Sequence, residues 1–166
     1  IQGTSLDGVR ARGISRSYVV LQLSTVFQQC LFLVFTGFMP LVLNVNLQLS
    51  PGVSALVVAL WLAVGVAAGF NAGRFVALLG GERRTLRISL ALTAFLLIAS
   101  SVLILSTQLW AVGLLLLVLS GIPYFLAFPV IYIIVGTTVP RNRLGLAYAA
   151  NLSFALTAGS ALSYLA

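Results

Sequence analysis

The sequence consists mainly of long apolar segments, and these limit the possible folds more than any other feature. They cover about residues 18–43, 51–79, 84–105, 109–139 and 143–166. Each is longer than the ~20 apolar residues that a helix needs to cross a hydrocarbon core of about 30 Å. In lipid the backbone must satisfy its own hydrogen bonds, and a helix does so within a single segment. We therefore predict an all-α fold, a polytopic transmembrane helical bundle with five spanning helices.

The charge composition excludes an ordinary soluble domain. Only 7% of the 166 residues are charged and 61% are hydrophobic, whereas a soluble domain carries about 25% charged residues. So few charges cannot cover a water-facing surface, and the expected surroundings are a lipid bilayer. Because all the basic residues are arginines and Ala, Val, Leu and Gly are abundant, we expect a GC-rich genome and a bacterial plasma membrane.

The positions of the nine arginines predict the orientation of the bundle. They lie on alternate connections: Arg10, Arg12 and Arg16 in the arm 1–17, then Arg74, Arg83, Arg84 and Arg87, then Arg141 and Arg143. Connections rich in arginine stay in the cytoplasm, so the N-terminus is predicted to be cytoplasmic. The arm is expected to be a cytoplasmic extension or a loop between two halves of a longer protein. No basic face is interleaved with aromatics, so nucleic acid is not an expected partner.

Proline, glycine and serine mark the expected helix ends and kinks. Ser50 is suited to cap a helix whose first position is Pro51, and the pair Gly80–Gly81 should end that helix. Pro40 is expected to bend or end the first helix. A kink or broken stretch is expected in the fourth segment, which contains Gly121, Pro123 and Pro129.

Three glycines of the second segment are spaced four residues apart. Gly65, Gly69 and Gly73 would share one helix face and let a neighbouring backbone approach closely. The alternative is ordinary helix packing with no family-specific meaning.

The glycine face leads into a basic turn that resembles a loop of the major facilitator superfamily (MFS). In that family the loop between the second and third helices of each half has two glycines followed by a basic pair. Here Gly73, Gly80 and Arg83–Arg84 stand at the matching places. Ala77–Leu78 stands where the stronger motif has an acidic and a basic residue, so the gating salt bridge of that motif is not carried over. An ordinary cytoplasmic loop is the alternative explanation.

The segment 139–145 resembles the family's link between its fourth and fifth helices, with a proline, two arginines and a glycine in order. The resemblance implies five helices of one six-helix half. Ala77 in place of an acidic residue, the lack of arginine in 114–132, and Gly159–Ser160 in place of a Gly-Pro pair all favour the C-terminal half. The expected partners are then the remainder of the transporter, the bilayer and a small-molecule solute.

The resemblance also implies which helices approach a central substrate cavity: the first, second, fourth and fifth of a half. The candidate cavity residues on them are polar or aromatic: Gln22, Thr25, Gln29, Phe32, Tyr124, Phe128, Tyr132, Tyr148 and Asn151. The alternative for each amide is a hydrogen bond that joins two helices.

The leading functional hypothesis is part of a secondary active transporter that moves a small solute by alternating access, as an exporter. A non-transporting MFS-like membrane subunit or assembly factor is the alternative. An enzyme is not expected, because paired acidic residues or histidines are typical of such sites, and Asp7 and Glu82 are the only acidic residues. Without histidine and with Cys30 alone, neither a metal site nor a cofactor is expected. The neutral polar and aromatic candidates favour an uncharged or amphipathic solute.

Overall fold

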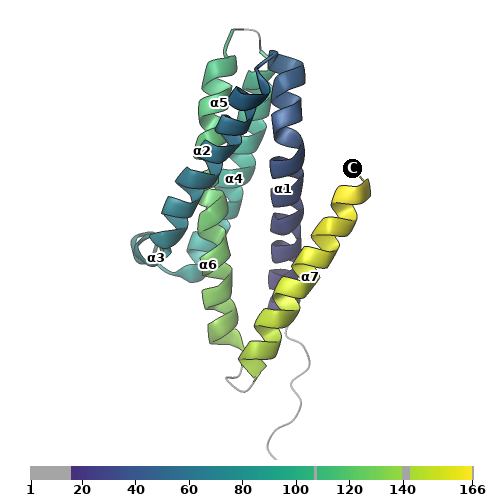
Figure 1. Cartoon of the computed structure of the whole chain (residues 1–166). Helices are drawn as coiled ribbons and strands as arrows, with labels where there is room; N and C mark the ends of the chain where they lie inside the picture. The colour runs from purple at the N-terminus through teal and green to yellow at the C-terminus, as the bar shows by residue number, and fades with distance from the viewer. Residues whose placement is uncertain (1–15, 107, 140–142, 166) are drawn as a thin grey trace, which may run out of the picture.

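A computed structural model describes residues 16–106, 108–139 and 143–165. These residues form seven helices: α1 (Arg16–Leu47), α2 (Pro51–Phe70), α3 (Ala72–Leu79), α4 (Glu82–Ile104), α5 (Trp110–Leu119), α6 (Gly121–Thr138) and α7 (Leu144–Leu165) (Figure 1). No strand occurs in these ranges, so the predicted all-α class is confirmed. Arg10, Arg12 and Arg141 lie outside the described residues.

Four helical stretches are long and apolar enough to cross a membrane. They are Val19–Leu47, Pro51–Phe70, Glu82–Ile104 and Trp110–Thr138, the last formed by α5 and α6 together. The described apolar part of α7, Leu144–Phe154, is shorter. The structure is thus compatible with an integral membrane protein of four or five spans, and the crossing of α7 stays a prediction.

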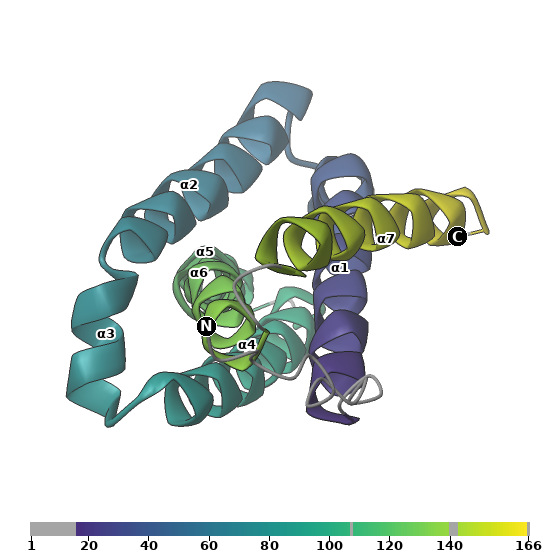
Figure 2. The same ribbon diagram turned by 90° about the horizontal axis from the view of Figure 1, so that it is seen from below.

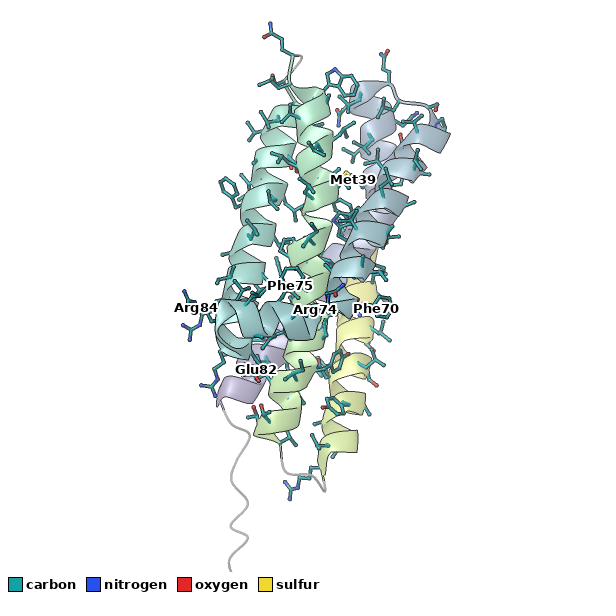
Figure 3. All side chains as sticks on the ribbon, turned by 90° about the vertical axis from the view of Figure 1, so that its left-hand side faces the viewer. Met39, Phe70, Arg74, Phe75, Glu82 and Arg84 are labelled. Atoms are coloured by element: carbon teal, nitrogen blue, oxygen red, sulfur yellow. The ribbon has the colours of Figure 1, made fainter. Side chains whose placement is uncertain are left out.

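The helices lie lengthwise around the continuous rod that α5 and α6 form (Figures 1 and 2). α6 contacts α1, α2, α4 and α7, which makes it the central element of the bundle. The short helix α3 lies across the bundle in the half where α1 and α7 begin and α6 finishes, and α6 and α7 extend beyond it. Figure 3 shows Glu82 in this half of the bundle, whereas Met39 lies in the other half. The described arginines therefore gather at one end of the bundle.

Several helix ends follow the local chemistry predicted from the sequence. The side chain of Ser50 accepts a hydrogen bond from the backbone N–H of Val53 (3.4 Å), which confirms the predicted cap of α2. Gly80 ends α3 in the left-handed conformation, with φ of 82°, which a residue without Cβ adopts at low cost. Pro40 does not end α1, because the helix continues through it to Leu47.

The second segment is divided at Asn71, where the sequence predicts one helix over 51–79. The Asn71 side-chain amide donates to the carbonyl of Ala67 (2.9 Å), and its backbone N–H bonds to Ala68 (3.0 Å). Because the side chain of Asn71 occupies the Ala67 carbonyl, which its own backbone N–H would use in a regular helix, that N–H turns to Ala68 and the regular ladder stops. The Asn71 carbonyl then accepts from Arg74 and Phe75, which starts α3.

The predicted break in the fourth segment lies at Ser120, between α5 and α6. Pro123 has no N–H, so the carbonyl of Leu119 lacks its usual partner four residues later. α6 nevertheless continues through Pro129.

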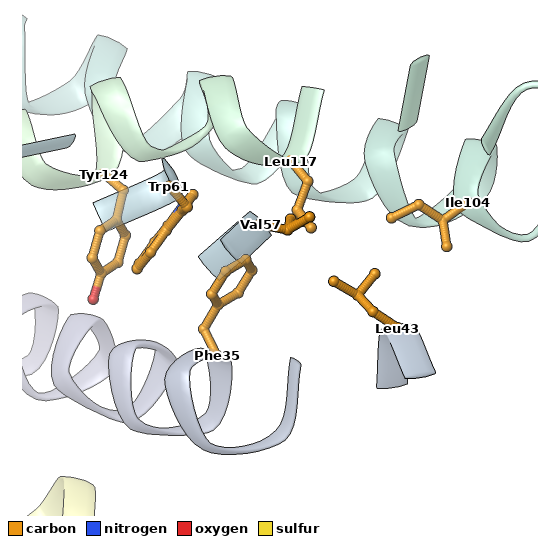
Figure 4. Packing of buried hydrophobic residues seen from close by; sticks show 7 residues of the cluster. All are labelled: Phe35, Leu43, Val57, Trp61, Ile104, Leu117 and Tyr124. Atoms are coloured by element: carbon orange, nitrogen blue, oxygen red, sulfur yellow. The ribbon is translucent and has the colours of Figure 1, made fainter. Parts of the chain in front are cut away.

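Two buried clusters hold the bundle together. One joins α1, α2, α4, α5 and α6, and its members are Phe35, Leu43, Val57, Trp61, Ile104, Leu117 and Tyr124 (Figure 4). The other lies toward the arginine-rich end and joins α4, α6 and α7 through Leu86, Ala127, Val130, Ile131, Ile134, Val135 and Ala147.

Candidate functional site

One face of α1 carries polar side chains into the bundle. Thr25 and Gln28 are buried on this face, and Phe32 and Phe35 follow them toward the aromatic cluster. Steps of three and four residues keep all of them on one side of the helix. The Thr25 hydroxyl donates to the carbonyl of Leu21 in its own helix (3.0 Å). Thr25 is therefore satisfied locally, and the unusual polar group on this face is Gln28.

Gln28 was not among the residues predicted from the sequence. It is only 2% exposed, and its side-chain oxygen and nitrogen have no hydrogen-bond partner among the described residues. The predicted candidates Gln22 and Gln29 lie beside this face and are half-buried. The signal that identifies Gln28 is its spacing of seven residues from Phe35, which places both on the buried stripe.

Asn151 is the matching buried amide on α7. The structure places this predicted residue at 0% exposure, with both polar side-chain atoms buried and unpartnered within the described ranges. α7 packs mainly against α1 and also touches α6. One turn earlier, Ala147 belongs to the cluster that Leu21 of α1 also contacts. Figure 1 shows that α1 and α7 rise from the same end of the bundle.

Tyr124 ties α6 to α1 beside these amides. Its hydroxyl donates to the backbone carbonyl of Gln28 (2.5 Å), and its ring lies 5.0 Å from that of Trp61 and 5.4 Å from that of Phe128. Phe32 packs against the same group at 6.4 Å from Trp61. Tyr124, Phe128 and Phe32 are thus brought together as predicted candidates, but as an interlocked aromatic wall rather than as separate lining residues.

Tyr132 and Tyr148 form a second pair between α6 and α7. The Tyr148 hydroxyl donates to the backbone carbonyl of Tyr132 (3.2 Å), and the rings lie 5.7 Å apart. Gly136 makes room for this contact, because a Cβ there would come within 2.8 Å of the Tyr148 hydroxyl. The pair lies nearer the arginine-rich end than Tyr124 does and joins the base of α7 to α6.

The three glycines of the second segment do not share one continuous face. Gly65 packs directly on α6, where a Cβ would clash with the ring of Phe125 and lie 2.9 Å from the carbonyl of Gly121. A Cβ at Gly69 would lie 3.6 Å from the Phe125 carbonyl, which is an ordinary van der Waals contact. Gly73 lies beyond the break, in α3, and a Cβ there would meet no atom within 4 Å. Of these three glycines, only Gly65 lies so close to a neighbouring helix that a Cβ would clash.

Within the loop motif, Gly80 and the two arginines Arg83 and Arg84 have different surroundings. Gly80 gives the left-handed turn, and the Arg84 guanidinium folds back toward it, 3.6 Å from the position of a Cβ. Arg83 and Arg84 are exposed, and no ion pair involves either within the described part of the chain.

Two cavities lie at opposite ends of the bundle. One, of about 430 Å³, opens between α1, α4 and α6 at the arginine-rich end and includes Arg83. The other, of about 470 Å³, lies beside the link from α1 to α2 and includes Asn46 and Trp110. Gln28 and Asn151 line neither of them.

Compared with known proteins, the chain matches no family model, no curated protein and no solved structure.

Proposed function

We propose that this chain is part of a secondary active transporter of the major facilitator type. It moves a small neutral or amphipathic solute across a bacterial plasma membrane by alternating access, and the arginine-rich end faces the cytoplasm. The remainder of the transporter supplies the second half of the path. Export is the favoured direction.

The observation that carries this proposal is the pair of buried amides, Gln28 and Asn151. Each leaves a donor and an acceptor without a partner in the described structure. An unsatisfied buried polar group costs about 1–3 kcal/mol, and buried polar groups in natural proteins are nearly always hydrogen-bonded. Within membrane helices such groups typically face a polar path or another protein segment. A solute that is bound only in some states of the transporter would supply the missing hydrogen-bond partners of both amides in those states.

The surroundings of the amides suit an amphipathic solute. The aromatic wall of Phe32, Trp61, Tyr124 and Phe128 lies next to Gln28 through the bond from Tyr124. Aromatic faces with a small number of polar groups are typical of small-molecule sites. No acidic residue lies in the described spans apart from Glu82 at the first turn of α4, so the proposed contacts to the solute are neutral.

The test is accumulation of neutral amphipathic dyes, N-phenylnaphthylamine and Nile red, in cells that lack their own efflux pumps. Expression of the full-length protein that contains this chain should lower the cellular dye level. Gln28→Leu and Asn151→Leu should each abolish this effect, because the leucine side chain keeps the volume but cannot hydrogen-bond. Gln29→Leu is the matched control: this sequence candidate lies one position along the same helix, but it is half-buried and outside the buried stripe of Gln28, so its replacement should leave export intact.

The packing hypothesis gives a different result. If the two amides only join helices, both variants would change thermal stability in detergent and leave dye export at the level of the parent protein. If the protein reaches the membrane but exports neither dye in any form, the transporter assignment for these solutes fails, and the non-transporting subunit becomes the better hypothesis.

A further inference from the structure

The cavity at the arginine-rich end combines charge with an apolar groove. Arg83 and Arg87 lie one turn apart on α4 and both line it. Both are exposed, and neither forms an ion pair with any residue in the described ranges. Two guanidinium groups at this spacing can hold one phosphate between them, because arginine donates in pairs to phosphate oxygens.

The rest of the groove is apolar. Val20 of α1, Leu90 of α4 and Ile134 of α6 line it beyond the arginines. The two hydroxyl groups on its wall donate to their own helices, Ser24 to Val20 (2.9 Å) and Thr138 to Ile134 (Thr138 Oγ1 to O, 2.5 Å). The groove therefore combines two exposed basic groups with a hydrocarbon lining.

The groove is also open to the region that lipid would occupy. Val20 is 55% exposed, and the neighbouring faces of α1 and α4 present further exposed apolar side chains such as Phe27 and Phe95. Both helices are candidate membrane spans, and Arg83 and Arg87 lie in the first two turns of α4, at the level expected for headgroups. A water-soluble anion would leave the apolar part of the groove unfilled, whereas an acyl chain would fill it.

We propose that this groove between α1, α4 and α6 is a binding site for an anionic phospholipid. Its phosphate bridges Arg83 and Arg87, and one acyl chain follows Val20, Leu90 and Ile134. Basic pockets between helices on the cytoplasmic side commonly hold such headgroups. The proposal needs the chain to lie in a membrane but does not depend on transport, so it can fail or hold independently of the function proposed above.

The test is native mass spectrometry of the chain purified in a neutral detergent, with equal amounts of phosphatidylglycerol and phosphatidylcholine carrying identical acyl chains. We expect preferential retention of phosphatidylglycerol. Arg83→Gln and Arg87→Gln should each weaken its binding about fivefold, since one basic residue near a membrane surface contributes ~1 kcal/mol. Phosphatidylcholine binding should change little.

Arg84→Gln is the matched control. Arg84 has the same charge and lies on the same helix, but it folds toward Gly80 and points away from the bundle (Figure 3). It does not line the groove, so its loss should leave phosphatidylglycerol binding within twofold of the parent. An equal loss in all three variants would show general attraction by surface charge and would overturn the proposal.

Two further arms separate a lipid from a free anion. Excess inorganic phosphate should not displace the lipid, because the acyl chain contributes to binding, and displacement would instead assign a soluble-anion site. Ser24→Phe should fill the groove and reduce lipid retention without changing the charge. Its circular dichroism and thermal transition must match the parent, and unchanged retention in this folded variant would also contradict the proposal.

Discussion

Trp61 of α2 contacts buried side chains of both α1 and α6. It is 1% exposed, its ring stacks on Phe35 with centroids 4.3 Å apart, and its indole N–H donates to the Ser120 hydroxyl (3.1 Å). The Ser120 acceptor lies at the break between α5 and α6. One side chain of α2 thus packs on α1 and fixes the break in the central rod.

Trp61→Ala should therefore be strongly destabilising. Loss of a buried large aromatic side chain leaves a cavity and costs about 3–5 kcal/mol, and here the Ser120 hydroxyl also loses a donor. The measurement is the free energy of unfolding in mixed detergent, followed by circular dichroism. Trp110→Ala is the control, because Trp110 is 41% exposed and its loss should cost less than about 0.5 kcal/mol. Equal effects of the two variants would contradict the packing described.

At the scale of elements, the contact between α2 and α6 depends on two glycines that face each other. Gly121 lies against the backbone of Trp61, and a Cβ at Gly121 would clash with the Trp61 carbonyl. Gly65 lies against Gly121 in turn, 2.9 Å from Cβ position to carbonyl. Small residues at such a crossing let two backbones approach within van der Waals distance.

Gly121→Ala should destabilise the bundle, because its added methyl group meets backbone rather than a flexible side chain. Overpacking of this kind typically costs about 1–3 kcal/mol. Gly73→Ala should be neutral or slightly stabilising, since a Cβ there has open space and alanine is the better helix former. The midpoints of thermal unfolding in detergent measure both. Equal destabilisation by the two alanines would be inconsistent with the observed packing.

The division of the second segment shows the limit of local sequence patterns at this scale. Apolar residues and glycine spacing predicted one helix over 51–79, but Asn71 divides it through its side-chain bond to Ala67. Asparagine also occurs inside helices, where its side chain points elsewhere, so the residue type alone does not mark a break. The interruption at Ser120 lies next to the predicted stretch, where Pro123 leaves the carbonyl of Leu119 without its usual donor, although Pro40 and Pro129 lack the same donor and do not interrupt their helices.

At the scale of the whole molecule, the alternating arginines predict which ends face the cytoplasm. In a Cys30→Ala background, Gln108→Cys lies between α4 and α5, and Leu78→Cys lies in α3 at the arginine-rich end. Both positions are exposed. In intact cells a membrane-impermeant maleimide should label Cys at position 108 and should reach position 78 only after permeabilisation. The reverse pattern would show that the arginine-rich end is external.

The sequence alone determined the helical class, the apolar spans, the cap at Ser50, the turn at Gly80 and the break near Pro123. These features depend on solvent, on backbone donors and on the conformational freedom of single residues, all of which act within a few residues along the chain. The sequence also contains the seven-residue spacing that places Gln28 and Phe35 on one face of the first helix. Gln22 and Gln29 have the same spacing, so the sequence did not show which of the two faces is buried.

Only the tertiary structure decided between these stripes. The orientation of α1 depends on where Tyr124 and Trp61 of other helices pack, and no local rule contains that information. The same holds for the burial of Gln28 and Asn151 without a hydrogen-bond partner among the described residues, and for the groove in which Arg83 and Arg87 meet apolar residues of α1 and α6. The burial of a side chain and the formation of a cavity are properties of several helices together, so they are fixed only when the bundle is assembled.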